Sequence, residues 1–538
     1  MKNIITVTIG LASTISIQSQ TLYSSAELDI NNVKAQIYSC GMFFSESSAD
    51  STGYFLIDNE NEISPIYQSA IWIGGLDSEG NLHFAAETFR NPEESPPERV
   101  DYWHGPVADS YNEDFDLRYN KVWKVNKSTI NTHINSYSSA DYEVPLEIED
   151  WPAHGIVSNG EAENLAAFVD TNLNGVYDPE NGDYPDIKGD QALFIIMNDD
   201  RDVHTASGGE KLVIEIHAML YAYNCPDNSI ATLNETTFLD LKIINRSENE
   251  YSELYVANWT DFDIGTAMDD NIGSDSTLSL VYAFNGDDID GDSLYLQSIY
   301  TYGENPPALG VKLLNANFST VISYLNSSNA TTGVPTQTQQ YYNYLQGKWK
   351  DGSPLTYGGN GVGGEEEVSF IYSSSPTNVD GWSMNQAGVL SHDIRGVGSV
   401  GPFTFSPGET IGLEYAIIFS RDLNLDNFEN ADLLLENSLT VQNFYDGLIS
   451  CSTIGVESIQ EVELSASPNP VKNTLMLSCE ISIANIIIYD INGRVVRNSY
   501  DLNSNNVNLD ISSLENGAYI LDITLINGDK TSKKIVKN

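Results

Sequence analysis

Short apolar runs that alternate with polar residues recur along most of this 538-residue chain, and turn signals separate them. Leu212, Ile214 and Ile216 alternate in one run, and residues 70–73 and 82–85 flank a polar turn. Comparable runs occupy residues 193–197, 238–244, 253–259, 278–284 and 411–419. Successive side chains of a strand point to opposite faces, so the pattern predicts antiparallel sheets with one face toward water. The expected fold class is mainly β, and the body of the chain is expected to be an antiparallel β-sandwich.

One helix and several loops interrupt the strands. Asp426 can cap a helix in which Ala431, Leu434 and Val441 recur at helical spacing. Residues 325–365 are polar, uncharged or Gly-rich, and they mark the place where the sandwich would divide if it contains two subdomains.

The last part of the chain carries the clearest hairpin signals. Asn492-Gly493 lies between two β-branched runs, and a second Asn-Gly pair lies between residues 518–526 and 530–536. Asn-Gly favours tight hairpins because both turn positions need positive φ. Residues 464–538 are therefore expected to form a small immunoglobulin-like β-sandwich, which residues 452–463 link to the body.

Four short motifs in this last part follow one another in a specific order. They comprise Pro468, Asn469 and Pro470, then Asn492, Gly493 and Arg494, then Gly517 and Tyr519, and finally Lys533 and Lys534. This segment resembles the type A C-terminal sorting domain of the type IX (Por) secretion system. It departs from the family at Ser467, where an aromatic residue is usual. The resemblance implies that the type IX machinery is a partner and that the protein reaches the outer cell surface, or is secreted, through the periplasm.

The N-terminus is typical of a secretory signal. Lys2 supplies a positive start, residues 4–17 are apolar or small without charge, and Ser19 lies near a plausible cleavage point before Thr21. Residues 1–20 are therefore predicted to be a signal peptide, although a buried N-terminal strand is the alternative. No later stretch approaches the roughly 18 apolar residues of a membrane span, so no transmembrane segment is expected in the mature chain.

The negative charge belongs almost entirely to the part before the sorting segment. The chain has 76 Asp and Glu against 25 Lys and Arg, a net charge of −51. Residues 461–538 are nearly neutral, so the acids lie mostly in the passenger, residues 21–451. Such a charge excludes nucleic acid and anionic membrane surfaces as expected partners, because phosphate contacts require cations.

One acidic segment has the spacing of a calcium loop. Asp170, Asn172 and Asn174 supply oxygens at alternate positions, and Gly175 allows the sharp turn that follows. The twelfth position is Asn181 instead of the usual Glu. Three nearby acids could replace it, namely Asp178, Glu180 and Asp183. The segment predicts a structural calcium site, and a solvated cluster of Asx turns is the alternative.

A second acidic region extends from Asp261 to Asp292. Its nine aspartates are Asp261, Asp263, Asp269, Asp270, Asp275, Asp287, Asp288, Asp290 and Asp292. No Lys or Arg lies between the first and the last of them, so a bound cation would relieve their repulsion. Calcium is again the expected ion, and a solvated acidic rim is the alternative.

The remaining chemical signals are weaker. Glu215 and His217 share one strand face and could meet His204, but strand alternation often produces such pairs by accident. The four cysteines allow three pairings or none, and a bond between Cys451 and Cys479 is the least expected. Several aromatic residues could stack on sugars but are more often core residues, namely Trp72, Tyr102, Trp103, Trp123, Trp151, Tyr302 and Tyr357.

No catalytic residue can be assigned from these patterns, and whether the protein is an enzyme stays open. The first hypothesis is a calcium-stabilised module for ligand binding or adhesion, with glycans or other surface ligands as partners. A secreted hydrolase acting on polysaccharide and a structural surface protein are the alternatives. Two carboxyls roughly 5–9 Å apart in a cleft would favour the hydrolase.

Overall fold

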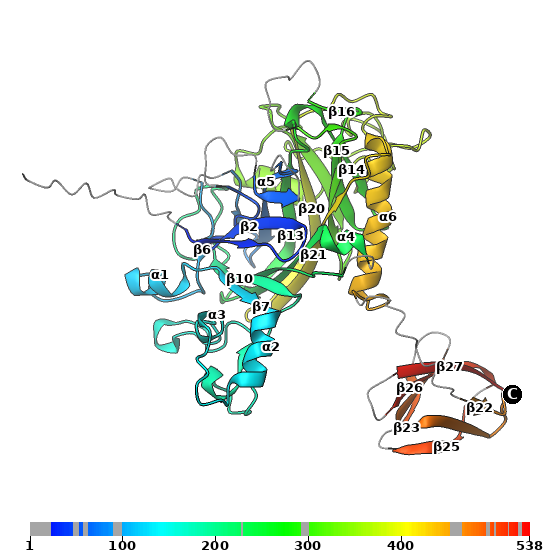
Figure 1. Ribbon diagram of the computed structural model, residues 1–538. Coiled ribbons are helices and arrows are strands. Elements are labelled where there is room, and N and C mark those ends of the chain that lie inside the picture. The colour runs from blue at the N-terminus through cyan, green and yellow to red at the C-terminus, as the bar shows by residue number, and fades with distance from the viewer. Residues whose placement is uncertain are drawn as a thin grey trace, which may run out of the picture. The chain divides into compact units, whose positions relative to one another are not determined.

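The computed structural model divides the chain into two compact units, Met1–Thr453 and Ile454–Asn538 (Figure 1). It describes residues 23–46, 53–57, 63–89, 99–226, 230–291, 301–451, 465–490, 495–499, 502–514, 516–525 and 530–538. The proposed signal peptide and linker lie outside these residues. Among the helices that the structure describes, none is both long and apolar enough to cross a bilayer.

A nine-stranded antiparallel sheet is the centre of the first unit. Its main path runs β14 (Asp270–Asp275), β15 (Leu280–Asn285), β18 (Ala308–Leu313), β21 (Thr410–Ser420), β12 (Thr236–Asn245), β11 (Ile214–Ala222), β10 (Gln191–Asn198) and β6 (Trp103–His104). β7 (Trp123–Asn126) also pairs with β10. Neighbouring strands are antiparallel throughout, so this part of the fold prediction is confirmed.

A second antiparallel sheet packs against the first. Its order is β19 (Thr320–Leu325), β20 (Ile394–Phe405), β13 (Tyr251–Phe262), β4 (Ile66–Leu76) and β5 (Leu82–Ala86). The predicted hairpin across residues 70–85 is the β4–β5 pair. A three-stranded sheet of β1 (Ser25–Leu28), β2 (Val33–Tyr38) and β3 (Phe55–Ile57) contributes to the same apolar core. The protein is therefore mainly β, as the alternation predicts.

The expectation of a water-exposed face is wrong for much of the central sheet. Eight of the nine residues of β11, whose sequence alternates, are buried, and so are all eight residues of β10. Helix α6 (Asn427–Tyr445) covers the outer face over β15, β18 and β21, and Figure 1 shows it along that side of the sheet. A second apolar cluster covers β10, so the hydrophobic effect acts on both faces of that strand.

Helix α6 begins where the sequence predicts. The Asp426 carboxylate accepts the N–H of Glu429, whose side chain in turn accepts the N–H of Asp426. This reciprocal capping box satisfies two donors that the first turn would otherwise leave unpaired. Ala431, Leu434 and Val441 are buried against the sheet.

The other elements of the first unit are short. They are α1 (Glu113–Tyr119), α2 (Lys127–Ser136), α3 (Leu146–Glu149), α4 (Ala231–Asn234), α5 (Thr338–Leu345), β8 (Phe168–Val169), β9 (Tyr184–Pro185), β16 (Ile289–Asp290), β17 (Gly303–Glu304) and three 3-10 turns, Val157–Asn159, Pro179–Asn181 and Ala267–Asp269.

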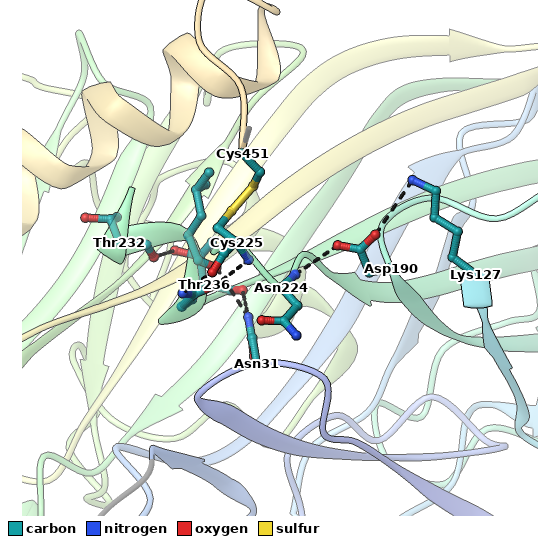
Figure 2. The surroundings of a disulfide bond; sticks show 10 residues. Asn31, Lys127, Asp190, Asn224, Cys225, Thr232, Thr236 and Cys451 are labelled. Carbon is teal, nitrogen blue, oxygen red and sulfur yellow. Dashed lines mark hydrogen bonds and ion pairs between the residues drawn. A yellow bond between two sulfur atoms is a disulfide. The ribbon is translucent and has the colours of Figure 1, made fainter. Parts of the chain in front are cut away.

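A disulfide joins Cys225 to Cys451, whose Cα atoms are 4.9 Å apart (Figure 2). The Cys225 N–H also donates to the Asn234 side chain at 2.7 Å, which fixes the loop after β11. The bond therefore fastens the end of the first unit to its central sheet, immediately before the linker. Cys40 and Cys479 are both buried.

The second unit is a six-stranded antiparallel structure with its own core. Its strands are β22 (Ser465–Ser467), β23 (Thr474–Asp490), β24 (Val495–Ser499), β25 (Ser504–Asp510), β26 (Gly517–Leu525) and β27 (Lys530–Lys537). The two predicted hairpins are the pairs β23–β24 and β26–β27. Both Asn-Gly turns lie outside the described residues.

Candidate calcium centres

The loop between β8 and β9 contains the first candidate site. These two-residue strands pair Phe168 with Pro185 and so bring the ends of the loop together. Asp183 is buried at the base, where its carboxylate oxygens accept the N–H groups of Thr171 at 2.8 Å and Asp178 at 3.0 Å. Asp183 therefore holds the loop backbone closed.

Four of the predicted ligands converge in this loop. Asp178 accepts the side-chain amides of Asn172 at 3.0 Å and Asn174 at 2.9 Å, and Asp170 accepts the N–H of Gly175 at 2.7 Å. Gly175 has a φ of +79°, which a side chain would strain. The amide oxygens of Asn172 and Asn174 accept the N–H groups of Asn174 at 3.1 Å and Val176 at 2.7 Å, so oxygens of both side chains lie inside the loop. The group can therefore offer the oxygen ligands that calcium prefers.

The ionisation of Asp178 suits this role. The Asn181 amide donates to its carboxylate at 2.9 Å and, with the other amides, lowers the pKa of Asp178. Glu180 is exposed, and no hydrogen bond between described residues joins it to the group. Of the three acids considered for the missing position, Asp178 is therefore the best candidate ligand, because it is the one that hydrogen-bonds to Asn172 and Asn174.

Residues 151–154, which precede this loop in the sequence, pack against it. The Tyr177 N–H donates to Nε2 of His154 at 3.0 Å, and the His154 ring meets Phe168 edge to face. Trp151 is buried and donates from Nε1 to the Ala167 carbonyl. These contacts orient the loop from outside.

In the second acidic region, Asp261 and Asp263 come together with an acid that sequence reasoning missed, Asp393. One oxygen of each lies within 4.8 Å of the others. Arg395 also enters the group, with Nε 2.9 Å from Asp261 Oδ1 and Nη2 3.0 Å from Oδ2, and it pairs with Asp393. The segment between Asp261 and Asp292 has no basic residue of its own, and Arg395 of β20, the strand that pairs with β13, supplies the positive charge.

Asp269, Asp270 and Asp290 are also buried, near the start of β14. Two of them accept hydrogen bonds from the backbone. Asp270 accepts the N–H of Ile264 at 2.9 Å, and Asp290 accepts the N–H of Thr266 at 2.9 Å. The other oxygen of Asp270 has no hydrogen-bond partner among the described residues. Arg421 offsets part of the Asp290 charge.

Of the four remaining aspartates, the three that the structure describes lie apart from both groups. Asp275 accepts the N–H groups of Thr277 and Leu278 in the β14–β15 turn, and Asp287 accepts that of Ile289. Asp287 and Asp288 are exposed. Asp292 lies outside the described residues.

Burial changes the protonation of the acidic region. It raises the pKa of Asp263 to about 8, with the Asp393 charge adding to the effect, and it raises the pKa of Asp269 to about 7. A carboxyl whose pKa is higher in the folded than in the unfolded state binds its proton more tightly when folded. Loss of that proton therefore destabilises the fold as the pH rises between the two values.

We expect the melting temperature of the protein in chelator to fall as the pH rises from about 5 to about 8. The measurement is a series of thermal melts at constant ionic strength. The Asp263→Asn variant should show a shallower fall, because it removes one of the titrating groups. A melting temperature that stays constant or rises over this interval would contradict the expectation.

Two weaker sequence signals do not assemble into sites. His217 Nε2 lies 2.9 Å from Glu215 Oε1, but His204 lies between the carbonyls of Phe84 and Asp199 instead. Five of the aromatic residues considered for sugar stacking are buried, namely Trp72, Tyr102, Trp103, Trp123 and Trp151. They are core residues, whereas Tyr357 is exposed.

In the second unit, the motif residues join distant strands. The Asn469 side chain donates to the Lys534 carbonyl at 3.1 Å and accepts the N–H of Val536 at 2.8 Å. Gly517 opens β26 opposite Lys537, and Tyr519 pairs with Ile535. Pro468 and Pro470 flank Asn469, while Lys533 and Lys534 are exposed on β27. Asn492, Gly493 and Arg494 lie outside the described residues.

Comparison with known proteins identifies this unit. Residues 465–538 match the model of the family described as the secretion system C-terminal sorting domain. The type IX sorting tail is thereby shown, and it directs the protein to the cell surface or to secretion through the type IX machinery. No curated protein matches the chain.

Two solved structures show only slight similarity. A polysaccharide lyase has 12% identity and a TM-score of 0.19, with 60% of this chain and 34% of the lyase covered. PorZ, a surface component of the type IX secretion system of Porphyromonas gingivalis, has 7% identity and a TM-score of 0.13, with 96% of this chain and 51% of PorZ covered. Scores this low do not establish a shared fold. The chain spans about a third of the length of the lyase and about half of the length of PorZ.

Proposed function

We propose that the first unit is a calcium-stabilised ligand-binding or adhesion module that works outside the cell after cleavage of an N-terminal signal peptide. The convergence of Asp170, Asn172, Asn174 and Asp178 on one loop is the observation that carries the calcium part of this proposal. Extracellular modules commonly bind calcium with dissociation constants of about 10⁻⁴ to 10⁻³ M. The sorting domain supports an extracellular location.

A binding role fits the acids better than a hydrolytic one. The tightest group of carboxylates, Asp261, Asp263 and Asp393, is engaged with Arg395, and Asp261 is only 1% exposed. Acids held in this way are not free to act as general acid and base on a polysaccharide. Glycans or other surface molecules are the proposed ligands.

We expect calcium to raise the melting temperature of the mature protein relative to chelator. Saturation at 100 times the dissociation constant corresponds to about 2.7 kcal/mol of stabilisation. Asp178→Asn should abolish most of the shift that arises from the loop, because it removes the acid on which the two amides converge. Glu180→Gln is the matched control, since it removes an equal charge outside the group. An unchanged melt with chelator, or an equal effect of both variants, would contradict the proposed site.

The binding role is tested by screening the same protein against a panel of polysaccharides with and without calcium. Retention of a polysaccharide without release of shorter products supports a binding module. Turnover of the polysaccharide would refute it in favour of a hydrolase.

A further inference from the structure

A pocket of about 510 Å³ lies over the outer face of the central sheet. Its floor is made by adjacent strands, because Phe194 of β10 pairs in register with Met219 of β11, which pairs with Asp240 of β12. Segment 164–168 forms one wall, and Lys188 forms another. The size and the mixed apolar and polar lining are typical of sites for small ligands.

The cations of this pocket differ in whether an acid already neutralises them. Lys188 is engaged, with Nζ 2.8 Å from Asp240 and 2.9 Å from Glu414. Lys242 is exposed and forms no ion pair with any residue that the structure describes. In a chain with 76 acids and 25 basic residues, a lysine left without an acid partner at a pocket is available for an external anion.

His217 lies beside this lysine. The two residues are direct cross-strand partners on β11 and β12, so their side chains start about 5 Å apart. Glu215 fixes the His217 ring through Nε2, and Arg246 fixes Glu215 at 2.6 Å. His217 also meets the Phe194 ring edge to face, with centroids 5.9 Å apart. A lysine, an imidazole and an aromatic ring are thus held side by side.

We propose that this pocket binds a small ring-bearing carboxylate of the acidic-sugar class. The carboxylate lies at Lys242 and His217, the ring lies over Phe194 and Met219, and the hydroxyls reach Asp186 at the rim. The assignment rests on the proposed function as a binding module and names its ligand class. The pocket contains none of the proposed calcium ligands, although Phe168, which lines it, pairs with Pro185 at the base of the acidic loop.

Calorimetric titration of the full mature protein with D-glucuronate and D-glucose tests this assignment, since the two sugars share a ring and differ by one carboxylate. We expect glucuronate to bind at least tenfold more tightly than glucose. Lys242→Gln should weaken glucuronate binding about tenfold, whereas Lys124→Gln, which removes a partly buried lysine paired with Asp29, should not. Ala167→Trp should block binding, because the exposed Ala167 side chain borders the pocket.

Absence of glucuronate binding would overturn the assignment, and so would three further results. They are equal binding of glucose and glucuronate, full affinity in Lys242→Gln, and binding of cyclohexanecarboxylate as strong as that of glucuronate. Thermal melts in calcium separate this test from that of the proposed function. If glucuronate fails to bind while the calcium shift remains, the pocket assignment fails alone. If the shift is absent while glucuronate binds, only the calcium proposal fails.

Discussion

Deletion of residues 465–538 is expected to leave the remaining chain in the periplasm, with essentially none at the cell surface or in the medium. These residues form the type IX sorting domain, which implies an interaction with the type IX machinery, so its removal should stop export at the periplasm. The truncated protein should still fold, because the apolar clusters of the first unit contain no residue of the second. The disulfide between Cys225 and Cys451 also lies entirely within the retained part.

Cell fractionation followed by immunoblotting measures this outcome, and protease treatment of intact cells reports surface exposure. Residues 452–538 fused to a periplasmic fluorescent protein are the matched control, and this fusion should be exported. Surface display of the truncated protein in wild-type amount would contradict the assignment. Degradation is distinguished from retention by the signal in the periplasmic fraction.

Local signals predict much of the fold. The Asp426 capping box and the apolar spacing of α6 involve residues a few positions apart, so the helix could be located before its environment was known. The hairpins of the sorting domain follow from Asn-Gly turns in the same way. Burial of both faces of β11 could not be predicted from its alternating sequence, because the segments that cover it are distant in the sequence.

The same distinction applies to the candidate sites. The β8–β9 loop was found because its ligands alternate within one short segment. Arg395 was missed because it reaches Asp261 only through the pairing of β13 with β20, across 134 positions. Asp393, two residues before it, was missed for the same reason. The pairing of Cys225 with Cys451 likewise depends on the path of α6 back to the sheet.

Replacement of Arg395 by Met is expected to lower the stability of the protein strongly. The Arg395 side chain is 4% exposed and pairs with Asp261 and Asp393, and its guanidinium carbon lies 5.0 Å from the centroid of the Phe89 ring. Removing one partner of a buried ion pair costs about 3–5 kcal/mol, because the remaining charge is left without compensation. Here three clustered carboxylates would lose their shared cation.

Denaturant unfolding at pH 8 measures this loss, and Lys348→Met, which removes an exposed lysine, should change stability by less than about 0.5 kcal/mol. Two conditions should restore part of the stability of Arg395→Met. The first is a lower pH, since protonation of Asp263 and its neighbours replaces the missing positive charge. The second is Asp261→Asn in the same chain, which removes one of the repelling charges and should give a favourable coupling energy. If the double variant is as unstable as the sum of the two single variants, Arg395 acts through packing on Phe89 and not through charge.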